Sequence, residues 1–191
     1  MRKMFLFCTA LIAANSLLAA ENTLVFEPAR TQIHWTLDTL LHTVHGTFQL
    51  RGGTVHYDAQ TGRASGELIV DARSGASGSN ARDSRMHSSI LESAKYTDIV
   101  FRPDHVDGAV PAHGDATIRV HGQFVLHGQA REMTLPIQLH VGEAETTARA
   151  SFPVAYLQWG LKNPSTFILK VADKVQIDLT SVARTTTEGG K

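Results

Sequence analysis

The sequence is poor in cysteine, and its single cysteine, Cys8, lies within the first twenty residues. Exported domains that cannot bury a sufficient core are commonly held together by disulfides. Residues 21–191 contain no cysteine with which to form one. This part of the chain must therefore be stabilised by burial alone. A chain of roughly 170 residues can achieve this, because it buries about 70% of the surface that its unfolded form exposes.

An excess of charge of one sign is also absent, since the chain has 18 Lys and Arg residues and 18 Asp and Glu residues. Arg2 and Lys3 are two of the basic residues, so residues 21–191 carry 16 basic and 18 acidic side chains. This balance gives no electrostatic reason to expect nucleic acid or an anionic membrane as a partner. Beyond residue 20 the sequence also lacks an apolar run long enough to span a bilayer, so we expect no integral membrane segment there.

What is present at the start of the chain is a short apolar run with basic residues before it. Arg2 and Lys3 precede a mostly apolar stretch over residues 4–18, and the small residues Ala19 and Ala20 follow. A basic region, an apolar region and small residues at a cut site are typical of a secretory signal peptide. We therefore expect residues 1–20 to be a Sec-type signal peptide that is removed after Ala20. The mature protein is expected to be periplasmic or secreted.

Most of the remaining chain alternates apolar with polar or small residues, as in Ile33, Trp35 and Leu37. The same period of two recurs at residues 55–57, 118–126, 135–141, 148–154, 167–171 and 175–179. A period of two predicts half-buried strands, and about eight are expected. Because no stretch reads as a domain boundary, residues 21–184 are expected to form one domain. The polar residues 185–191 are expected to be a flexible tail.

Two segments interrupt the strands in this interpretation. Gly52 and Gly53 predict a turn before the strand of Val55. Residues 75–80 are rich in Gly and Ser, and residues 81–91 read as one short helix with Ser79 or Asn80 as its cap. Many antiparallel strands and one helix predict an all-β fold, either a closed barrel or a sandwich.

Four stretches, taken in order and spacing, resemble the YceI-like family of exported, lipocalin-like proteins. They are residues 30–35 with 42–48, residues 71–75 with 81–86 and 95–101, residues 120–128, and residues 159–165 with 171–177. The resemblance runs from about residue 23 to residue 183. It implies an extended antiparallel lipocalin-like barrel with one short helix and a long apolar interior. It also implies non-catalytic binding, sequestration or transport of a long-chain isoprenoid or another amphiphilic lipid, without a cofactor.

The expected tunnel lining combines strand parity for Trp35 and four phenylalanines, one face of the expected helix, the loop at residue 159 and this resemblance. The candidate residues are Trp35, Phe48, Met86, Ile90, Leu91, Phe101, Phe124, Phe152 and Trp159. An alternative reading is a barrel whose core is filled by these side chains, because eight-stranded barrels can be just wide enough for that. Met86, Ile90 and Leu91 could close the barrel as well as contact ligand, and Trp159 could pack in a barrel corner as well as line a portal.

The candidate head-group residues are Arg82 and Arg85, whose guanidinium groups could meet a polar or phosphate head group. The alternative is an exposed pair at the helix start, in which Asp83 is favoured by the helix dipole. If the barrel is filled, the protein is instead an exported stress-response or interaction protein that acts through its surface. An apolar face of the barrel could also join two copies of the chain in a homodimer.

Ten histidines invite a metal hypothesis, but their spacing along the chain does not support one. Two ligands on one strand face would lie two residues apart, and no His-x-His occurs. The His-Glu-x-x-His and Cys/His zinc patterns are absent as well, so no metal site is expected. Gly-x-Ser-x-Gly is also absent. An enzyme acting on a lipid-like substrate is therefore the least favoured of the three functions.

Overall fold

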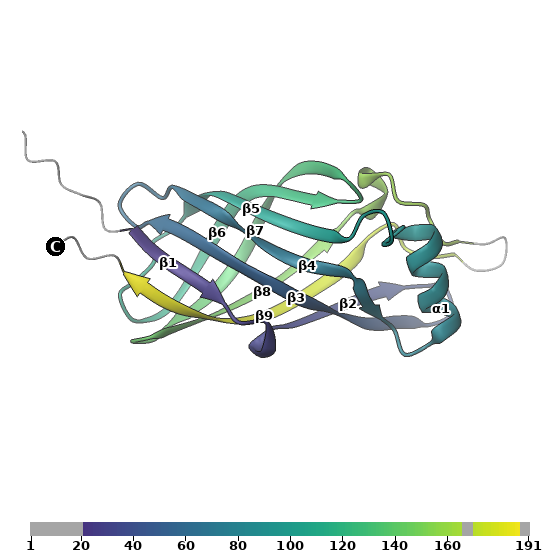
Figure 1. Ribbon diagram of the computed structural model, residues 1–191, viewed down its shortest axis with the longest axis horizontal. Coiled ribbons are helices and arrows are strands. Elements are labelled where there is room, and N and C mark those ends of the chain that lie inside the picture. The colour runs from purple at the N-terminus through teal and green to yellow at the C-terminus, as the bar shows by residue number, and fades with distance from the viewer. Residues whose placement is uncertain (1–20, 166–169, 188–191) are drawn as a thin grey trace, which may run out of the picture.

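A computed structural model describes residues 21–165 and 170–187, and these residues form an antiparallel sheet of nine strands. The signal peptide expected at residues 1–20 lies outside the described residues. The strands are β1 (Glu21–Phe26), β2 (Gln32–Asp38), β3 (Thr43–Asp58), β4 (Ala64–Ala76), β5 (Asp98–Asp107), β6 (Gly114–Leu126), β7 (Gln129–Val141), β8 (Glu145–Val154) and β9 (Val175–Thr187). The molecule is long in the direction of its strands. Helix α1 lies at one end, and β1 begins and β9 ends at the other (Figure 1).

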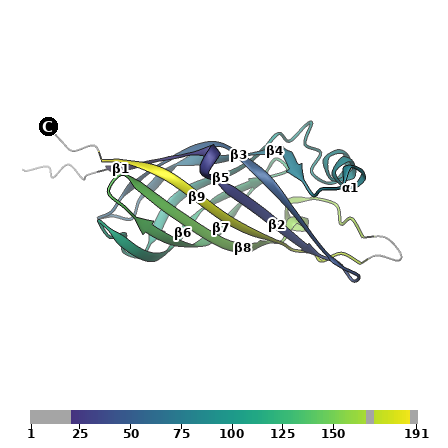
Figure 2. The same ribbon diagram turned by 90° about the horizontal axis from the view of Figure 1, so that it is seen from below.

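The sheet closes on itself, which confirms the barrel and excludes the sandwich. Its strand order runs β1-β3-β2-β9-β8-β7-β6-β5-β4, and β4 also pairs with β3. β1 and β2 share one position in the wall: each pairs with β3 on one side and β9 on the other, β1 near one end and β2 near the other. Nine strands therefore fill eight places in the barrel. The short 3₁₀ turn η1 (Pro28–Arg30) joins the two tandem strands, and Figure 2 shows β9 running beside both.

In the first half of β2, buried apolar residues alternate with exposed polar ones, as the sequence predicts. In β2, Ile33 and Trp35 are buried, whereas Gln32 and His34 are exposed. Closure removes the open edges that such strands would otherwise present to other chains.

The turn predicted at Gly52–Gly53 is wrong, because both glycines lie inside β3. The pairing of β3 with β4 shifts register between Leu50 and Gly52, so the glycines lie at a bulge in a continuous strand. Glycine produces the same local signal at a bulge as at a turn.

The single helix predicted for residues 81–91 is present but divided. Helix α1 covers Asn80–Arg85, and a π-helical turn covers Met86–Ile90 and ends in a hydrogen bond from the Leu91 N–H to the Met86 carbonyl oxygen (2.8 Å). Within the described ranges, no helix has the length and apolar character needed to cross a membrane.

Two other boundaries differ from the sequence-based expectation. β9 continues to Thr187, where it pairs with Asn22 of β1, so residues 185–187 belong to the barrel wall and not to a tail. Their backbone N–H and C=O groups are paired with β1, and this pairing keeps the three threonines in the sheet although their side chains are polar. Of the strand predicted at residues 167–171, residues 167–169 lie outside the described residues, and Val171 forms an isolated bridge with Thr39.

Candidate functional site

The barrel encloses a cavity of about 200 Å³ to which all nine strands contribute side chains. The lining consists of Leu24, Phe26, Ile33, Phe48, Leu50, Val55, Tyr57, Leu68, Val70, Ile99, Phe101, Pro103, Val106, Val110, Ile118, Val120, Phe124, Leu135, Ile137, Leu139, Val141, Thr146, Ala148, Phe152, Ile177, Leu179 and Ala183. An engineered apolar protein cavity of about 150 Å³ stays dry and holds benzene. This cavity can therefore accept part of an apolar ligand as it stands.

Among the described residues that line the cavity, only two side chains carry a polar group and none carries a formal charge. These are Tyr57 and Thr146. Burial raises the pKa of the Tyr57 phenol, because the apolar surroundings disfavour its charged form. The Thr146 hydroxyl lies 3.1 Å from that of Thr185. Tyr57 pairs with Asn22, and Thr146 pairs with Ala183, so both groups lie towards the barrel end where β1 begins, opposite α1.

Four of the nine residues predicted to line a tunnel are part of this lining: Phe48, Phe101, Phe124 and Phe152. Phe124 and Phe152 meet edge to face with ring centres 6.5 Å apart. Phe124 meets Trp159 in the same way at 5.7 Å. Edge-to-face contacts of this kind stabilise aromatic clusters.

The other five predicted residues, Trp35, Met86, Ile90, Leu91 and Trp159, do not line the cavity. Met86, Ile90, Leu91 and Trp159 belong to or pack against one apolar cluster that also contains Tyr156 and Leu161. The Trp159 indole N–H donates to the Phe124 carbonyl oxygen (3.1 Å). This cluster joins the segment after β8 to the segment around α1, so these four side chains pack beside the cavity.

Trp35 is buried in the barrel wall beside a glycine of the neighbouring strand. It pairs with Gly46, and a Cβ placed on Gly46 would lie 2.3 Å from two carbons of the indole ring. The indole Nε1 is buried and has no hydrogen-bond partner among the described residues. The absence of a side chain at Gly46 is therefore what makes room for Trp35.

The two predicted head-group arginines contact the protein itself. Arg82 donates from Nε to the Ser77 hydroxyl (2.7 Å) and from a terminal nitrogen to the Ser77 carbonyl oxygen (3.0 Å). Arg85 donates to the Pro164 carbonyl oxygen at 3.4 Å. Asp83 accepts hydrogen bonds from the Ser77 N–H and hydroxyl, and the hydroxyl bond is the main cause that lowers the pKa of Asp83. Arg82 and Asp83 thus both fix the loop before α1 through hydrogen bonds with Ser77.

Sequence reasoning missed two features. The aliphatic part of the lining was not singled out, although strand parity is the signal that could have found it. The structure also gathers Asp104, His121 and Glu132 from three strands, with one candidate ligand atom from each within 4.8 Å of the others. Spacing along the chain contains no signal for such a cluster.

The family model of the YceI-like domain matches residues 24–183. The chain belongs to the YceI-like family. A UPF0312 protein of Pseudomonas putida is 30% identical to this YceI-like chain over 129 residues, which are 66% of this chain. The match spans 65% of the length of that relative.

Solved structures have the same fold as this YceI-like chain. Burkholderia cenocepacia BcnA has a TM-score of 0.67 at 17% identity, covering 82% of this chain and 98% of BcnA. A polyisoprenoid binding domain from Saccharophagus degradans has a TM-score of 0.66 at 15% identity, covering 86% of this chain and 98% of that domain. Campylobacter jejuni YCEI has a TM-score of 0.55 at 10% identity, covering 96% of this chain and 92% of that one.

Proposed function

We propose that this protein binds a long-chain isoprenoid or a related amphiphilic lipid, with the apolar tail inside the barrel. The observation that carries the proposal is the lining, which is supplied by every strand and contains two hydroxyl groups and no charge. Burying one methylene group contributes about 0.8 kcal/mol. A hydrocarbon chain therefore gains affinity with each unit that it places in such an interior.

The cavity supports a binding function over the two alternatives. A cavity of about 200 Å³ argues against a barrel that is filled by its own side chains. General acid–base or nucleophilic catalysis needs positioned titratable or nucleophilic groups. Among the described residues of this lining the only such groups are the hydroxyls of Tyr57 and Thr146, and no Asp, Glu, His, Lys, Cys or Ser is there to activate them. We infer that binding occurs without a reaction and that the protein sequesters or transports its lipid.

The similarity to the Saccharophagus degradans structure, which is described as a polyisoprenoid binding domain, supports an isoprenoid as the cargo. The pattern of residues 1–20 supports action in the periplasm or outside the cell. A long hydrocarbon chain is insoluble in such an aqueous compartment, and a closed barrel can carry it across.

The orientation of the lipid is part of the proposal. Tyr57 and Thr146 are the polar members of the lining and lie towards the end opposite α1. The four lining phenylalanines accept the tail. Arg82 is held by two hydrogen bonds to Ser77. Arg85, which donates to the Pro164 carbonyl oxygen at 3.4 Å, lies on α1 at the other end of the barrel, so in this orientation neither arginine is placed to meet the polar head group.

Native mass spectrometry of the protein purified from its exporting host, followed by organic extraction of the sample, tests the proposal. A stoichiometric prenyl or acyl species would establish the cargo and identify it. A clean apo mass with no uptake of added polyprenyl lipids would reject lipid binding.

A cavity-filling variant provides the matched test. Ala148 lines the cavity on β8, so Ala148→Phe adds a ring inside the barrel without adding polarity. Gln138→Phe adds the same ring at an exposed position of β7. We expect lipid uptake to fall in Ala148→Phe and to be unchanged in Gln138→Phe, with both variants folded by circular dichroism. Equal uptake by Ala148→Phe and the wild type would contradict binding in this cavity.

A further inference from the structure

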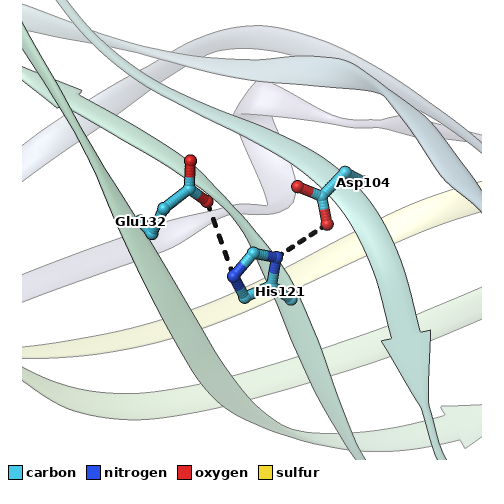
Figure 3. A group of neighbouring side chains, drawn as sticks. All are labelled: Asp104, His121 and Glu132. Atoms are coloured by element: carbon cyan, nitrogen blue, oxygen red, sulfur yellow. Dashed lines mark hydrogen bonds and ion pairs between the residues drawn. The ribbon is translucent and has the colours of Figure 1, made fainter.

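Three side chains from three neighbouring strands meet on the outer surface of the barrel, outside the cavity. Asp104 lies on β5, His121 on β6 and Glu132 on β7 (Figure 3). The His121 Nδ1 lies 2.8 Å from an Asp104 carboxylate oxygen, and its Nε2 lies 3.5 Å from a Glu132 carboxylate oxygen. The three side chains are between 40% and 57% exposed, so an ion can reach them from solvent.

A β-bulge places Asp104 in this group. The pairing of β5 with β6 passes from Pro103↔Gly122 to His105↔His121, which leaves Asp104 as the extra residue. Pro103 lines the cavity, whereas Asp104 is exposed and hydrogen-bonds to His121. β-Bulges are known to re-aim side chains in this way, and they are common next to functional sites.

Gly122 permits the close approach of the two strands at this bulge. A Cβ at Gly122 would lie 2.3 Å from the Arg102 carbonyl oxygen and 2.7 Å from the Pro103 Cα. Any other residue there would push β5 away from β6. The bulge and the glycine together bring the Asp104 carboxylate to the imidazole of His121.

The donor set determines what the group can hold. One imidazole nitrogen and two carboxylate oxygens suit divalent first-row transition metals, and Zn²⁺ binds such atoms at about 2.0–2.2 Å. Two carboxylates with a neutral imidazole also match the charge of a divalent cation. We propose that Asp104, His121 and Glu132 form a surface site for a divalent first-row transition metal ion, for which Zn²⁺ is the probe.

The metal-free arrangement is consistent with this proposal. A hydrogen bond to Asp104 raises the pKa of His121, and Asp104, Glu132 and Asp107 add favourable charge. The two ring nitrogens face different carboxylates, Nδ1 that of Asp104 and Nε2 that of Glu132. A bound ion takes one ring nitrogen, and the carboxylate at the other nitrogen rotates to reach it, which the exposure of all three side chains allows. Water can complete the coordination because the site is open on the solvent side. The site is independent of the lipid cavity.

Isothermal titration calorimetry of untagged protein, stripped with a chelator and titrated with ZnCl₂, tests the proposal. We expect one Zn²⁺ per chain at this site. His121→Ala and Glu132→Gln should each lower the affinity by at least about tenfold, since even the loss of outer-shell partners costs about 10–100-fold. The imidazole nitrogens of His121 should also shift in the ¹⁵N NMR spectrum when Zn²⁺ is added.

The protein offers a matched control in a second exposed histidine–carboxylate pair. His140 on β7 lies 2.7 Å from a carboxylate oxygen of Asp115 on β6. This pair belongs to no three-ligand group among the described residues. His140→Ala should leave the Zn²⁺ affinity unchanged. An equal loss in His140→Ala and His121→Ala would show adventitious binding to surface histidines and overturn the proposal, as would Zn²⁺ binding by His121→Ala at the wild-type affinity.

Discussion

At the scale of single residues, the contact between Trp35 and Gly46 shows how closely the barrel wall is packed. A methyl group at Gly46 would meet both the indole ring and the Ala76 carbonyl oxygen at 2.3 Å. Gly52, on the same strand, has no atom within 4 Å of the corresponding point. The two glycines therefore respond differently to the same substitution.

We expect Gly46→Ala to lower the free energy of unfolding by about 1–3 kcal/mol, the usual cost of overpacking a well-packed site. Gly52→Ala is the control and should change stability by less than about 0.5 kcal/mol, as is typical of substitutions that disturb no packing. Urea denaturation of both variants measures the difference. Equal losses would show that Trp35 does not depend on the space at Gly46.

The same scale explains which site residues the sequence could predict. Parity assigns Phe48, Phe101, Phe124 and Phe152 to the inner face, and these four do line the cavity. Parity does not tell how far along the barrel axis a residue lies. It therefore cannot separate Trp35, which packs over Gly46, from the side chains that line the cavity. For Met86 and Trp159 the sequence leaves both core packing and ligand contact open, because their contacts with distant segments are set by tertiary packing.

At the scale of elements, the start of α1 is held by the Asp83 side chain, which is not the residue that a capping pattern predicts. Ser79 is the N-cap residue, but its side chain makes no capping hydrogen bond. Asp83 instead binds back to Ser77, and Arg82 binds the same serine. Local composition predicted the helix, and the π-helical turn that follows it has no comparable signal. Gly52 and Gly53 likewise indicate an interruption of regular strand geometry, but not whether that interruption is a turn or a bulge.

Asp83 makes the stability of this segment sensitive to acid. Because its folded-state pKa is lowered by the Ser77 hydroxyl, its contribution is present above the unfolded value of about 3.9 and is lost as the pH falls through the folded value. We expect Asp83→Asn to melt below the wild type near pH 7, and the two melting temperatures to converge by about pH 2.

The control for this prediction is Asp115→Asn, because the Asp115 side chain is 86% exposed on β6. Its melting temperature should stay close to that of the wild type at both pH values. A gap between Asp83→Asn and the wild type that persists in acid would mean that the charge of Asp83 is not what holds the loop.

At the scale of the whole molecule, the cavity links stability to ligand. Ligand pockets for drug-sized molecules measure about 300–1,000 Å³, so the long lipid proposed above would fill this cavity of about 200 Å³ only if lining side chains moved apart. A ligand that binds only the folded barrel stabilises it by an amount that grows with the logarithm of the free ligand concentration divided by the dissociation constant.

Free ligand at one hundred times its dissociation constant should raise the free energy of unfolding by about 2.7 kcal/mol. Thermal melts of stripped protein with and without a polyprenyl lipid measure this shift. Ala148→Phe should show a smaller shift than Gln138→Phe. A shift of the same size in both variants would place the lipid outside the cavity.

The pairing of β9 with β1 and β2 determines when the molecule can fold. The first described residues pair with the last, as in Asn22↔Thr187, and β9 supplies a neighbour to three other strands. Contacts so distant in sequence slow folding, and here they cannot form until the ribosome has released the C-terminal strand. The nascent chain thus has no closed barrel to adopt before β9 has emerged. For the exported protein proposed above, late closure would keep the chain open while it is being made, which is the form that a narrow translocation channel accepts.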